Sequence, residues 1–378
     1  MAVRRGGERA VHHSGWVCRS YLSGEPDAYR DEECRERTAL SRTPLSRLPP
    51  APPTSGRRTV ADGLPVPVRN AKERDESMFV ITGASGRTGR AAAVRLLADG
   101  YPVRAIGRSA RRLADLAERG AEVWEADQTD TVALTDAFRG ADGVYAVIQP
   151  NYIPDHPDFG AFQDQVTASL TKAVTASGIT RVVGLSSWGA QHTEGTGPVT
   201  GLHRFEQALS AAPGVDTLWL RAGYFMENLL DHIDVVRDHH RISAPFDPDL
   251  PLPFVATRDI GVRAAKELAT GTWRGTEVLE LQGERDVSMR EATDAIAKAV
   301  GADDLSYEQI SLAAFHAELR RNGVSANVAD MMAEVGKSLN SRHTRMRQPR
   351  TARTSTPTSI ERFVEEEFAP RYRATESE

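Results

Sequence analysis

Cysteine is nearly absent from this sequence, and long apolar runs are absent altogether. Two cysteines among 378 residues exclude a disulfide scaffold and a multi-cysteine zinc site. Both, Cys18 and Cys34, lie in the first 77 residues. A chain otherwise free of cysteine suits a reducing compartment, so we expect a cytoplasmic protein. No window approaches the roughly 18–20 uninterrupted apolar residues of a membrane span, so we expect no membrane partner.

An excess of basic charge is also lacking. The chain has 47 Lys and Arg residues against 52 Asp and Glu residues, a formal net charge of −5. This balance argues against direct nucleic-acid binding, which requires a strongly basic surface that displaces counterions. Apolar residues make up 40% and charged residues 26% of the chain, an ordinary globular composition. The length corresponds to two or three folding units, or to one large α/β unit.

Residues 1–77 differ in composition from the rest of the chain. They hold 8 of the 21 prolines and carry 14 basic against 11 acidic residues, a charge of +3, while residues 78–378 carry −8. No helical or strand period persists, and no apolar run follows Arg4 and Arg5 as a secretory signal would require. We interpret the segment as a disordered extension, or as the result of a start codon assigned upstream of Met78. Its histidines and cysteines lack metal-ligand spacing, and we predict no metal site.

From Met78 onward, short apolar runs alternate with segments of helical periodicity. Strands are predicted at 78–82, 103–106, 122–125, 143–148, 181–185 and 216–220. Helices are predicted between them at 87–99, 109–119, 130–139, 160–177 and 201–211. Such alternation is typical of a parallel sheet with helices on both faces. We therefore predict an α/β fold with a doubly wound parallel sheet over residues 78–222.

After residue 222 the alternation loosens. One strand is predicted at 277–282, and helices are predicted at 260–269, 289–300, 311–322, 325–339 and 359–368. Thr358 has the spacing of a cap for the last helix. We predict a smaller C-terminal α+β lobe over 223–372, with late segments that return to the main domain, and a tail at 373–378. The basic stretch 342–353 is interpreted as a solvated loop, with anion contact as the alternative.

A glycine-rich turn joins the first strand to the first helix. It reads Gly-Ala-Ser-Gly-Arg-Thr-Gly over 83–89. A turn that lets a pyrophosphate approach excludes side chains, and the helix behind it offers unpaired N–H groups and the positive end of its dipole. The alternative is an ordinary glycine turn. We predict a dinucleotide site whose phosphate-binding residues are Gly83, Ser85, Gly86, Arg87, Thr88 and Gly89.

An arginine follows the second strand. An NAD-specific site places an acid there to bind the ribose hydroxyls, whereas here Gly107 is followed by Arg108. A guanidinium group pairs well with a 2′-phosphate, and Arg87 would add a second positive charge. The sequence therefore predicts NADP(H) in preference to NAD(H). The alternative is that Arg108 is a solvated surface residue.

Polar residues also follow the third, fourth and fifth strands, at the edge where open α/β sheets bind ligands. Asp127 and Gln128 fit an adenine contact, although a helix cap is the alternative for Asp127. Gln149 and Ser186 occupy positions that favour contact with nicotinamide or substrate. Serine is also common after strands because its side chain favours turns, and this is the alternative for Ser186.

Several motifs resemble the NmrA-like family of atypical short-chain dehydrogenase/reductases. They are the glycine turn, Arg108, the sequence ADQTD after the third strand, LSSWGA at the end of the fifth, and LRAGYFMENLL over 220–230. Segments 255–265, 279–289 and 359–370 fit the same pattern, so the resemblance covers about residues 78–372. It implies a Rossmann domain that binds NADP(H), a smaller C-terminal lobe and a cleft between them.

The resemblance also implies residues for the nicotinamide side of the cleft. Tyr224, Phe225 and Asn228 would line it, with core packing as the alternative for the two aromatic residues and helix capping for Asn228. The Tyr-x-x-x-Lys pair of active short-chain dehydrogenases is missing, since 201–206 reads Gly-Leu-His-Arg-Phe-Glu. His203 and Tyr224 are therefore the candidate catalytic residues, and a surface position is the alternative for His203.

These features predict an NADPH-dependent oxidoreductase of a small quinone- or enone-type substrate. The motivation is the intact turn and a cleft rich in aromatic residues at 145, 188, 224 and 225. The cofactor would carry the hydride chemistry, and the protein would orient the reactants. The family also contains regulators that bind nucleotide without turning it over. The alternative is therefore a non-catalytic NADP(H) redox sensor that regulates a partner protein, and an oligomer is compatible with both.

Overall fold

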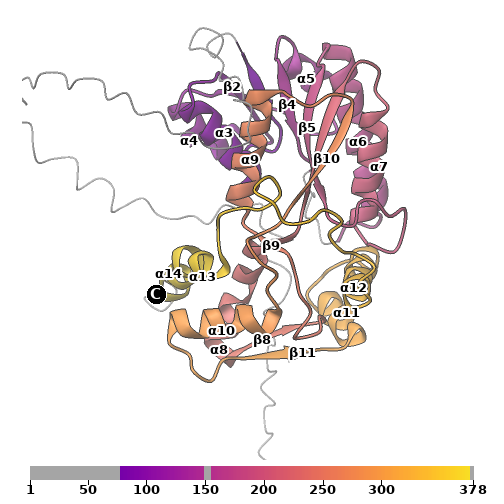
Figure 1. The fold of residues 1–378 in the computed structure, drawn as a ribbon. Helices are drawn as coiled ribbons and strands as arrows, with labels where there is room; N and C mark the ends of the chain where they lie inside the picture. Colours follow the sequence, from indigo (N-terminus) through magenta and orange to yellow (C-terminus); the bar gives the residue numbers. More distant parts are fainter. Residues whose placement is uncertain (1–76, 149–154, 375–378) are drawn as a thin grey trace, which may run out of the picture.

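The structure is a computed structural model that describes residues 77–148 and 155–374. The predictions for residues 1–76, for Gln149 and for 375–378 lie outside the described residues. The described chain forms a larger lobe, built on a parallel sheet, and a smaller lobe below it in Figure 1. Within these two ranges, no helix has the length and apolar character needed to cross a membrane.

The described residues of the larger lobe form a seven-stranded sheet in the order β10-β6-β5-β4-β1-β2-β3. Every neighbouring pair is parallel. The strands are β1 (Phe79–Ile81), β2 (Val103–Gly107), β3 (Glu122–Glu125), β4 (Gly143–Ala146), β5 (Arg181–Ser187), β6 (Asp216–Ala222) and β10 (Thr276–Leu281). The chain adds β2 and β3 on one side of β1 and the later strands on the other, so the order reverses between β1 and β4. The predicted doubly wound Rossmann-type sheet is confirmed.

Burial along the strands follows their place in the sheet. Every residue of β1 and β4 is buried, as expected for central strands that are covered on both faces. In β3, which forms one edge, both end residues are exposed. The apolar character of β1 and β4 therefore agrees with their central place in the sheet.

Helices cover both faces of the sheet. α3 (Arg87–Ala98) and α9 (Thr257–Thr270) pack together on one face. α5 (Thr131–Phe138), α6 (Phe159–Ser177) and α7 (Val199–Ser210) cover the other face (Figure 1). Each layer encloses its own apolar core, so the sheet is held rigidly between them.

The helix predicted over 109–119 begins differently from the prediction. It starts as a 3-10 turn, η1 (Ala110–Leu113), and α-helical hydrogen bonding begins only in α4 (Ala114–Glu118). Leu113 is fully buried, whereas Arg108 is exposed. The tighter turn brings the leucine into the core a few residues after the exposed arginine.

α3 and α9 approach closely because small residues face each other. At Gly261 of α9, a Cβ atom would lie 2.4 Å from the carbonyl oxygen of Thr88 and 2.6 Å from the Cβ of Ala91. Only glycine fits such a contact. Ala264 and Ala265 of the same helix are also buried. The close contact fixes α9 against the first half of α3, and α9 follows the first excursion of the chain into the smaller lobe.

The chain leaves the sheet after β6, returns as α9 and β10, and then leaves again. The smaller lobe has the elements β7 (Tyr224–Phe225), η2 (Met226–His232), α8 (Ile233–His239), β8 (Arg241–Ala244), β9 (Phe254–Val255), α10 (Met289–Val300), β11 (Ser306–Gln309), α11 (Leu312–Arg321), α12 (Ala326–Asn340), α13 (Ile360–Phe363), η3 (Val364–Phe368) and α14 (Ala369–Ala374). β8 pairs with β11, and β7 pairs with β9, both in parallel. The division of the chain at residue 222 stays a prediction.

The C-terminal helical segment differs from the prediction at both ends. Ser359, and not Thr358, is the cap, since its hydroxyl accepts the N–H of Arg362 at 3.1 Å. A π-helical turn, η3, joins α13 to α14 and extends the segment to Ala374, beyond the predicted end at 368. Residues 342–353 contain neither helix nor strand, as predicted, and lie in the segment that crosses between the two lobes (Figure 1).

Candidate functional site

One buried threonine ties the carboxyl ends of β1 and β4 together. Thr82 follows β1, and its hydroxyl accepts the N–H of Val147 at 2.9 Å and donates to the carbonyl of Tyr145 at 3.1 Å. Gln128, which follows β3, donates from Nε2 to the carbonyl oxygen of Val147 at 2.6 Å. These segments meet at the point where the strand order reverses, which is where open α/β sheets bind ligands.

The glycine turn between β1 and α3 leaves no room for side chains at two of its positions. Gly83 has a φ of 60°, in the left-handed region that favours glycine. The N–H of Gly86 donates to the carbonyl of Gly83 at 2.9 Å and closes the turn. At Gly89, a Cβ atom would lie only 2.4 Å from that same carbonyl oxygen. The backbone of the turn therefore favours glycine at position 83 and excludes a side chain at position 89.

The N-terminus of α3 lacks a side-chain cap. Gly86 is the N-cap residue, it makes no side-chain cap hydrogen bond, and the first turn contains no acidic residue. Arg87, the first residue of the helix, is exposed, whereas Thr88 and Gly89 are buried. The first N–H groups and the positive end of the helix dipole therefore face the turn without a competing carboxylate, which is the arrangement of an anion site.

Arg108 lies beside this turn. A Cβ atom on its neighbour Gly107 would lie 3.5 Å from the Oγ of Ser85, so the end of β2 adjoins the glycine turn. The Arg108 side chain is exposed. Together with Arg87 it places two positive charges next to the uncapped end of α3.

The residues after β3 have partners within the chain. Asp127 is exposed, and its Oδ1 accepts the N–H of Thr129 at 2.8 Å and the hydroxyl of the same residue at 2.7 Å. The N-cap of α5 is Asp130, so Asp127 is not the cap of that helix. The adenine contact of Asp127 and Gln128 stays a prediction.

Ser186 takes part in a buried charged network. Its side chain is 2% exposed, and its hydroxyl donates to Oε1 of Glu206 on α7. Arg221 of β6 forms a bidentate pair with the same carboxylate, with Nε–Oε1 at 2.9 Å and Nη2–Oε2 at 2.6 Å. The network joins α7 to the ends of β5 and β6. The predicted nicotinamide contact of Ser186 would have to share its hydroxyl with Glu206.

Two of the four aromatic residues predicted to line a cleft are buried in the cores instead. Tyr145 is fully buried and Trp188 is 8% exposed. Tyr145 lies on a central strand and packs in the core that α3 and α9 cover. Burial raises the pKa of its hydroxyl, and the nearby Thr88 side chain opposes this rise. These two side chains support the site from within and do not form its surface.

The other two aromatic residues are half-buried at the junction of the lobes. The Tyr224 ring packs edge-on against Phe246 and Phe254, with centroid distances of 5.7 and 5.1 Å. Phe225 packs against the core on the α3 face of the sheet, and Asn228 is half-buried in η2. Both aromatic side chains thus contribute to packing and keep part of their surface exposed.

His203 lies on α7 and is half-buried. Its Nδ1 is 2.8 Å from the carbonyl oxygen of Ala190, a contact that orients the ring. Within the ranges that the structure describes, no group of three or more His, Cys, Asp or Glu side chains has the geometry of a metal site. His203 thus remains a single oriented imidazole.

Glu227 is a site residue that the sequence did not reveal. Its buried carboxylate accepts the N–H of Thr257 at 2.9 Å and the hydroxyl of Thr257 at 2.6 Å, at the N-terminus of α9. Burial raises the pKa of this carboxyl, while the bonds from Thr257 and the charge of Arg87 lower it. Glu227 therefore links η2 to α9 within electrostatic reach of the glycine turn. Only its place in the 220–230 motif could have indicated it.

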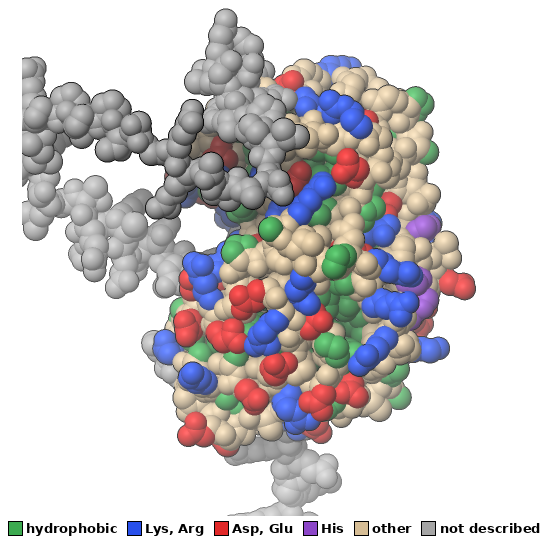
Figure 2. All heavy atoms as spheres, viewed as in Figure 1, with side chains coloured by type: hydrophobic (Ala, Val, Ile, Leu, Met, Phe, Trp, Pro, Cys, Tyr) green, Lys and Arg blue, Asp and Glu red, His purple; other side chains and the backbone are tan. Residues whose placement is uncertain are grey.

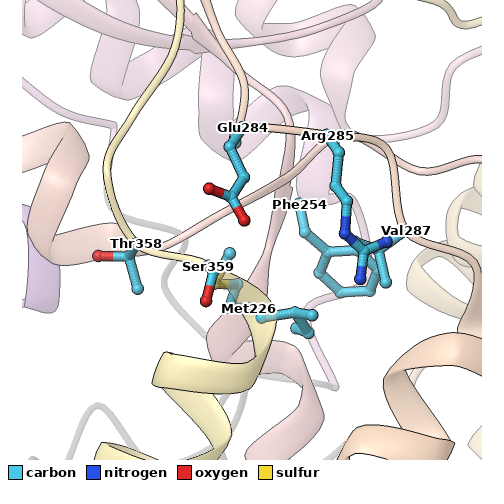
Figure 3. Close-up of a pocket in the computed structure, with 9 residues that line it drawn as sticks. Met226, Phe254, Glu284, Arg285, Val287, Thr358 and Ser359 are labelled. Atoms are coloured by element: carbon cyan, nitrogen blue, oxygen red, sulfur yellow. The ribbon is translucent and has the colours of Figure 1, made fainter.

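A small pocket lies next to the predicted residue Tyr224, whose ring packs against the pocket residue Phe254. Figure 3 shows Met226 and Phe254 beside the loop that carries Glu284 and Arg285. Arg285 forms ion pairs with Glu291 at 2.9 Å and with Glu361 at 2.8 Å. Among the predicted site residues that the structure describes, none lines the pocket itself.

The raised pKa of Glu227 predicts a specific pH dependence of stability. The folded state holds the proton more tightly than the unfolded state, so this contribution to stability is complete below pH 4.5 and is lost as the pH rises through the folded pKa. The unfolding free energy of the wild type, measured relative to Glu227→Gln by urea denaturation, should therefore fall as the pH rises above 4.5. The total loss of unfolding free energy is about 1.4 kcal/mol for each unit by which the folded pKa exceeds the unfolded pKa.

Glu118→Gln, at an exposed position of α4, is the matched control. It should change the unfolding free energy by less than about 0.5 kcal/mol at any pH. If the difference in unfolding free energy between the wild type and Glu227→Gln does not vary with pH, burial does not raise the pKa of the Glu227 carboxyl.

Several known proteins are similar to this chain. The (4-alkanoyl-5-oxo-2,5-dihydrofuran-3-yl)methyl phosphate reductase of Streptomyces griseus is 29% identical over 276 residues, which cover 68% of this chain and 92% of that protein. The NAD(P)H azoreductase of Xenophilus azovorans is 25% identical over 259 residues, which cover 68% of this chain and 86% of that protein. Both alignments span more than two thirds of the relative.

Two solved structures share the fold. The NADPH-dependent quinone oxidoreductase of Escherichia coli, complexed with NADPH, matches with a TM-score of 0.64 and 24% identity, over 77% of this chain and all of that one. NmrA, described as a negative transcriptional regulator and solved in complex with NAD, matches with a TM-score of 0.62 and 16% identity, over 80% of this chain and 98% of that one.

The sequence model of the NmrA-like family matches residues 75–363. The match includes the glycine turn at 83–89, the 220–230 motif, the first excursion into the smaller lobe and the second as far as the end of α13. It covers more than half of the chain and agrees with the fold. The chain belongs to the NmrA-like family.

Proposed function

We propose that this chain is an NADPH-dependent oxidoreductase that reduces a small quinone- or enone-type molecule. The observation that carries the proposal is the approach of Gly89 to Gly83 at the uncapped N-terminus of α3. This geometry suits the pyrophosphate of a dinucleotide. Family membership supports the proposal, since two relatives are named as reductases and one neighbour was solved with NADPH.

The residues present fit a phosphorylated nicotinamide dinucleotide. The N–H groups at the start of α3 would bind the pyrophosphate, and Arg108 would pair with the 2′-phosphate. Bound NADPH would supply a hydride. The remaining contacts assigned to the cofactor are those of Ser85, Asp127, Gln128, Gln149, Ser186, Tyr224, Phe225 and Asn228.

On the substrate side, the half-buried rings of Tyr224 and Phe225 would bind a flat conjugated molecule. His203 is the proposed proton donor, and the Tyr224 hydroxyl is the second candidate. Because Nδ1 of His203 contacts the Ala190 carbonyl, Nε2 is the nitrogen left to exchange a proton with the substrate.

The names of the relatives support this substrate class. The Streptomyces protein is named for a ring that carries an oxo group, with an alkanoyl substituent and a phosphate ester, and the Xenophilus protein for azo compounds. The Escherichia protein is named for quinones. Quinones, azo compounds and unsaturated carbonyl compounds all accept a hydride into a conjugated system.

The role of Arg108 predicts a change in nucleotide preference. Arg108→Ala should raise the Kd of NADPH about 10- to 100-fold, since a charge-assisted contact contributes about 1.5–3 kcal/mol, and should leave the Kd of NADH nearly unchanged. Fluorescence titration of reduced nicotinamide measures both values. Arg119→Ala, an exposed arginine at the end of α4, is the control and should alter neither. Equal affinity of the wild type for NADPH and NADH would overturn the preference.

The proposed activity predicts NADPH oxidation that depends on the acceptor. The absorbance of NADPH should fall in proportion to one member of a panel of quinones and enones. His203→Asn should lower kcat about 100-fold or more while the Kd of NADPH stays constant. If no member of the panel is reduced, the oxidoreductase assignment fails.

The absence of the Tyr-x-x-x-Lys pair favours one other function. α7 contains neither tyrosine nor lysine, and the NmrA neighbour is named as a regulator. The chain would then sense the redox state of NADP(H) and regulate a partner protein. Sensing requires different affinities for NADP⁺ and NADPH, since equal affinities shift no equilibrium. Binding without consumption, with unequal affinities, would favour this function over the reductase.

A further inference from the structure

Two histidines and two arginines form a basic cluster at the junction of the lobes. The cluster consists of His192, His343, Arg345 and Arg347. Its first member lies in the loop between β5 and α7, and the others lie in the segment that follows α12. Figure 2 shows Lys, Arg and His side chains gathered at the right-hand side of this face, at the level where α7 and α12 lie in Figure 1.

The segment that carries the arginines is anchored on both sides. Thr344 is buried and shares a hydrogen bond of 2.8 Å with Ser338. Beyond it, the N–H of Gln348 donates to the carboxylate of Glu280 at 2.7 Å, and the N–H of Arg347 donates to the same oxygen. The arginines therefore extend from a backbone that is fixed, which reduces the entropy lost on binding a ligand.

Side chains alternate between the two anchors. Met346 is half-buried, and its Cε would lie 3.1 Å from a Cβ on Gly223, at the end of β6. Arg345 and Arg347 are both exposed. In an extended segment, residues two apart project to the same side. The methionine thus packs inward while both guanidinium groups face solvent together.

The electrostatics of the cluster are positive. The rings of His192 and His343 lie with their centroids 3.9 Å apart. Burial lowers the pKa of His192, and the charges of His343, Arg347 and Arg345 lower it further, so all four groups are within electrostatic reach of one another. Nε2 of His192 is buried and has no hydrogen-bond partner among the described residues.

Two of the acidic groups nearby are occupied elsewhere. Glu280 accepts backbone N–H groups, and Glu206 is paired with Arg221. Glu194 contacts His343 through its backbone carbonyl, at 3.4 Å. In the described ranges, Arg345 and Arg347 form no ion pair with a carboxylate. The cluster therefore holds positive charge that a bound anion would neutralise.

The cluster is separate from the phosphate sites proposed for the cofactor. Those sites lie at the ends of β1 and β2, whereas the cluster lies next to the ends of β5, β6 and β10. In the sheet order, two strand spacings separate β1 from β5, which is about 10 Å, and four separate β2 from β6, which is about 19 Å. An anion at the cluster would therefore belong to a second molecule.

We propose that the basic cluster binds the phosphate group of a phosphate-monoester substrate, whose reacting part lies toward Tyr224. The assignment to a substrate rests on the proposed function. A phosphate monoester carries nearly two negative charges at neutral pH and three strong acceptor oxygens. Two guanidinium groups on a fixed segment match that charge, and planar guanidinium groups bind phosphate in bidentate fashion.

Calorimetry on the full chain, saturated with NADPH so that the cofactor phosphate sites are filled, tests the proposal. The probes are phenyl phosphate, benzoate and phenol. Phenyl phosphate should bind to the wild type more tightly than benzoate, and phenol should not bind measurably. The variant Arg345→Gln/Arg347→Gln should weaken phenyl phosphate binding at least about tenfold, since it removes two charge-assisted contacts.

The matched control is Arg119→Gln/Arg321→Gln, which removes the same charge from exposed positions outside the cluster. This control should bind phenyl phosphate as the wild type does. Three results would each overturn the proposal. The two double variants could bind phenyl phosphate with equal affinity, the wild type could bind benzoate as tightly as phenyl phosphate, or the wild type could fail to bind phenyl phosphate.

Kinetics separates this proposal from the proposed function. A hydroxymethyl enone and its phosphate ester should differ in KM, and Arg345→Gln/Arg347→Gln should raise the KM of the ester alone with little change in kcat. If neither compound oxidises NADPH while phenyl phosphate binding still depends on the arginines, the reductase assignment fails and the phosphate site stands.

Discussion

The contact of α3 with the turn in front of it and with α9 beside it constrains the rest of the site. At Gly89 and at Gly261, a Cβ atom would lie 2.4 Å from a backbone oxygen, so neither position accepts a side chain. The first contact brings the uncapped end of α3 against the turn after β1. The second fixes α9, and with it the return of the chain from the smaller lobe. Both lobes are therefore positioned against the same helix.

The remaining groups of the site depend on this frame through buried polar contacts. Glu227 holds η2 to the N-terminus of α9 through Thr257. The pair of Glu206 with Arg221 holds α7 to the ends of β5 and β6. Burying a carboxylate at such a junction costs folding free energy unless the carboxylate is hydrogen-bonded or paired with a cation. Glu227 is hydrogen-bonded to Thr257, and Glu206 is paired with Arg221. The proposed cofactor end and the proposed substrate end of the site thus lie on opposite sides of the point where the strand order of the sheet reverses.

The sequence predicted the features that depend on local pattern. Apolar runs and glycine spacing predicted β1, the turn at 83–89 and α3. Sequence analysis missed Glu227 and the partners of Ser186, because their contacts join residues 30 and 20 positions apart. It counted Tyr145 among the aromatic residues of a cleft, whereas the burial of this side chain depends on the helices that cover the sheet. The short pair β8 and β11 had no periodicity long enough to detect.

The most direct test of the central claim is the affinity of Gly89→Ala for NADPH, measured by calorimetry next to Gly160→Ala. At Gly160, in the first turn of α6, a Cβ would make only ordinary contacts at 3.6 Å. The alanine at position 89 must push α3 away from the turn, so NADPH binding should weaken at least about tenfold, the equivalent of 1.4 kcal/mol, while the control binds normally. Unchanged affinity in a folded Gly89→Ala protein would contradict the account.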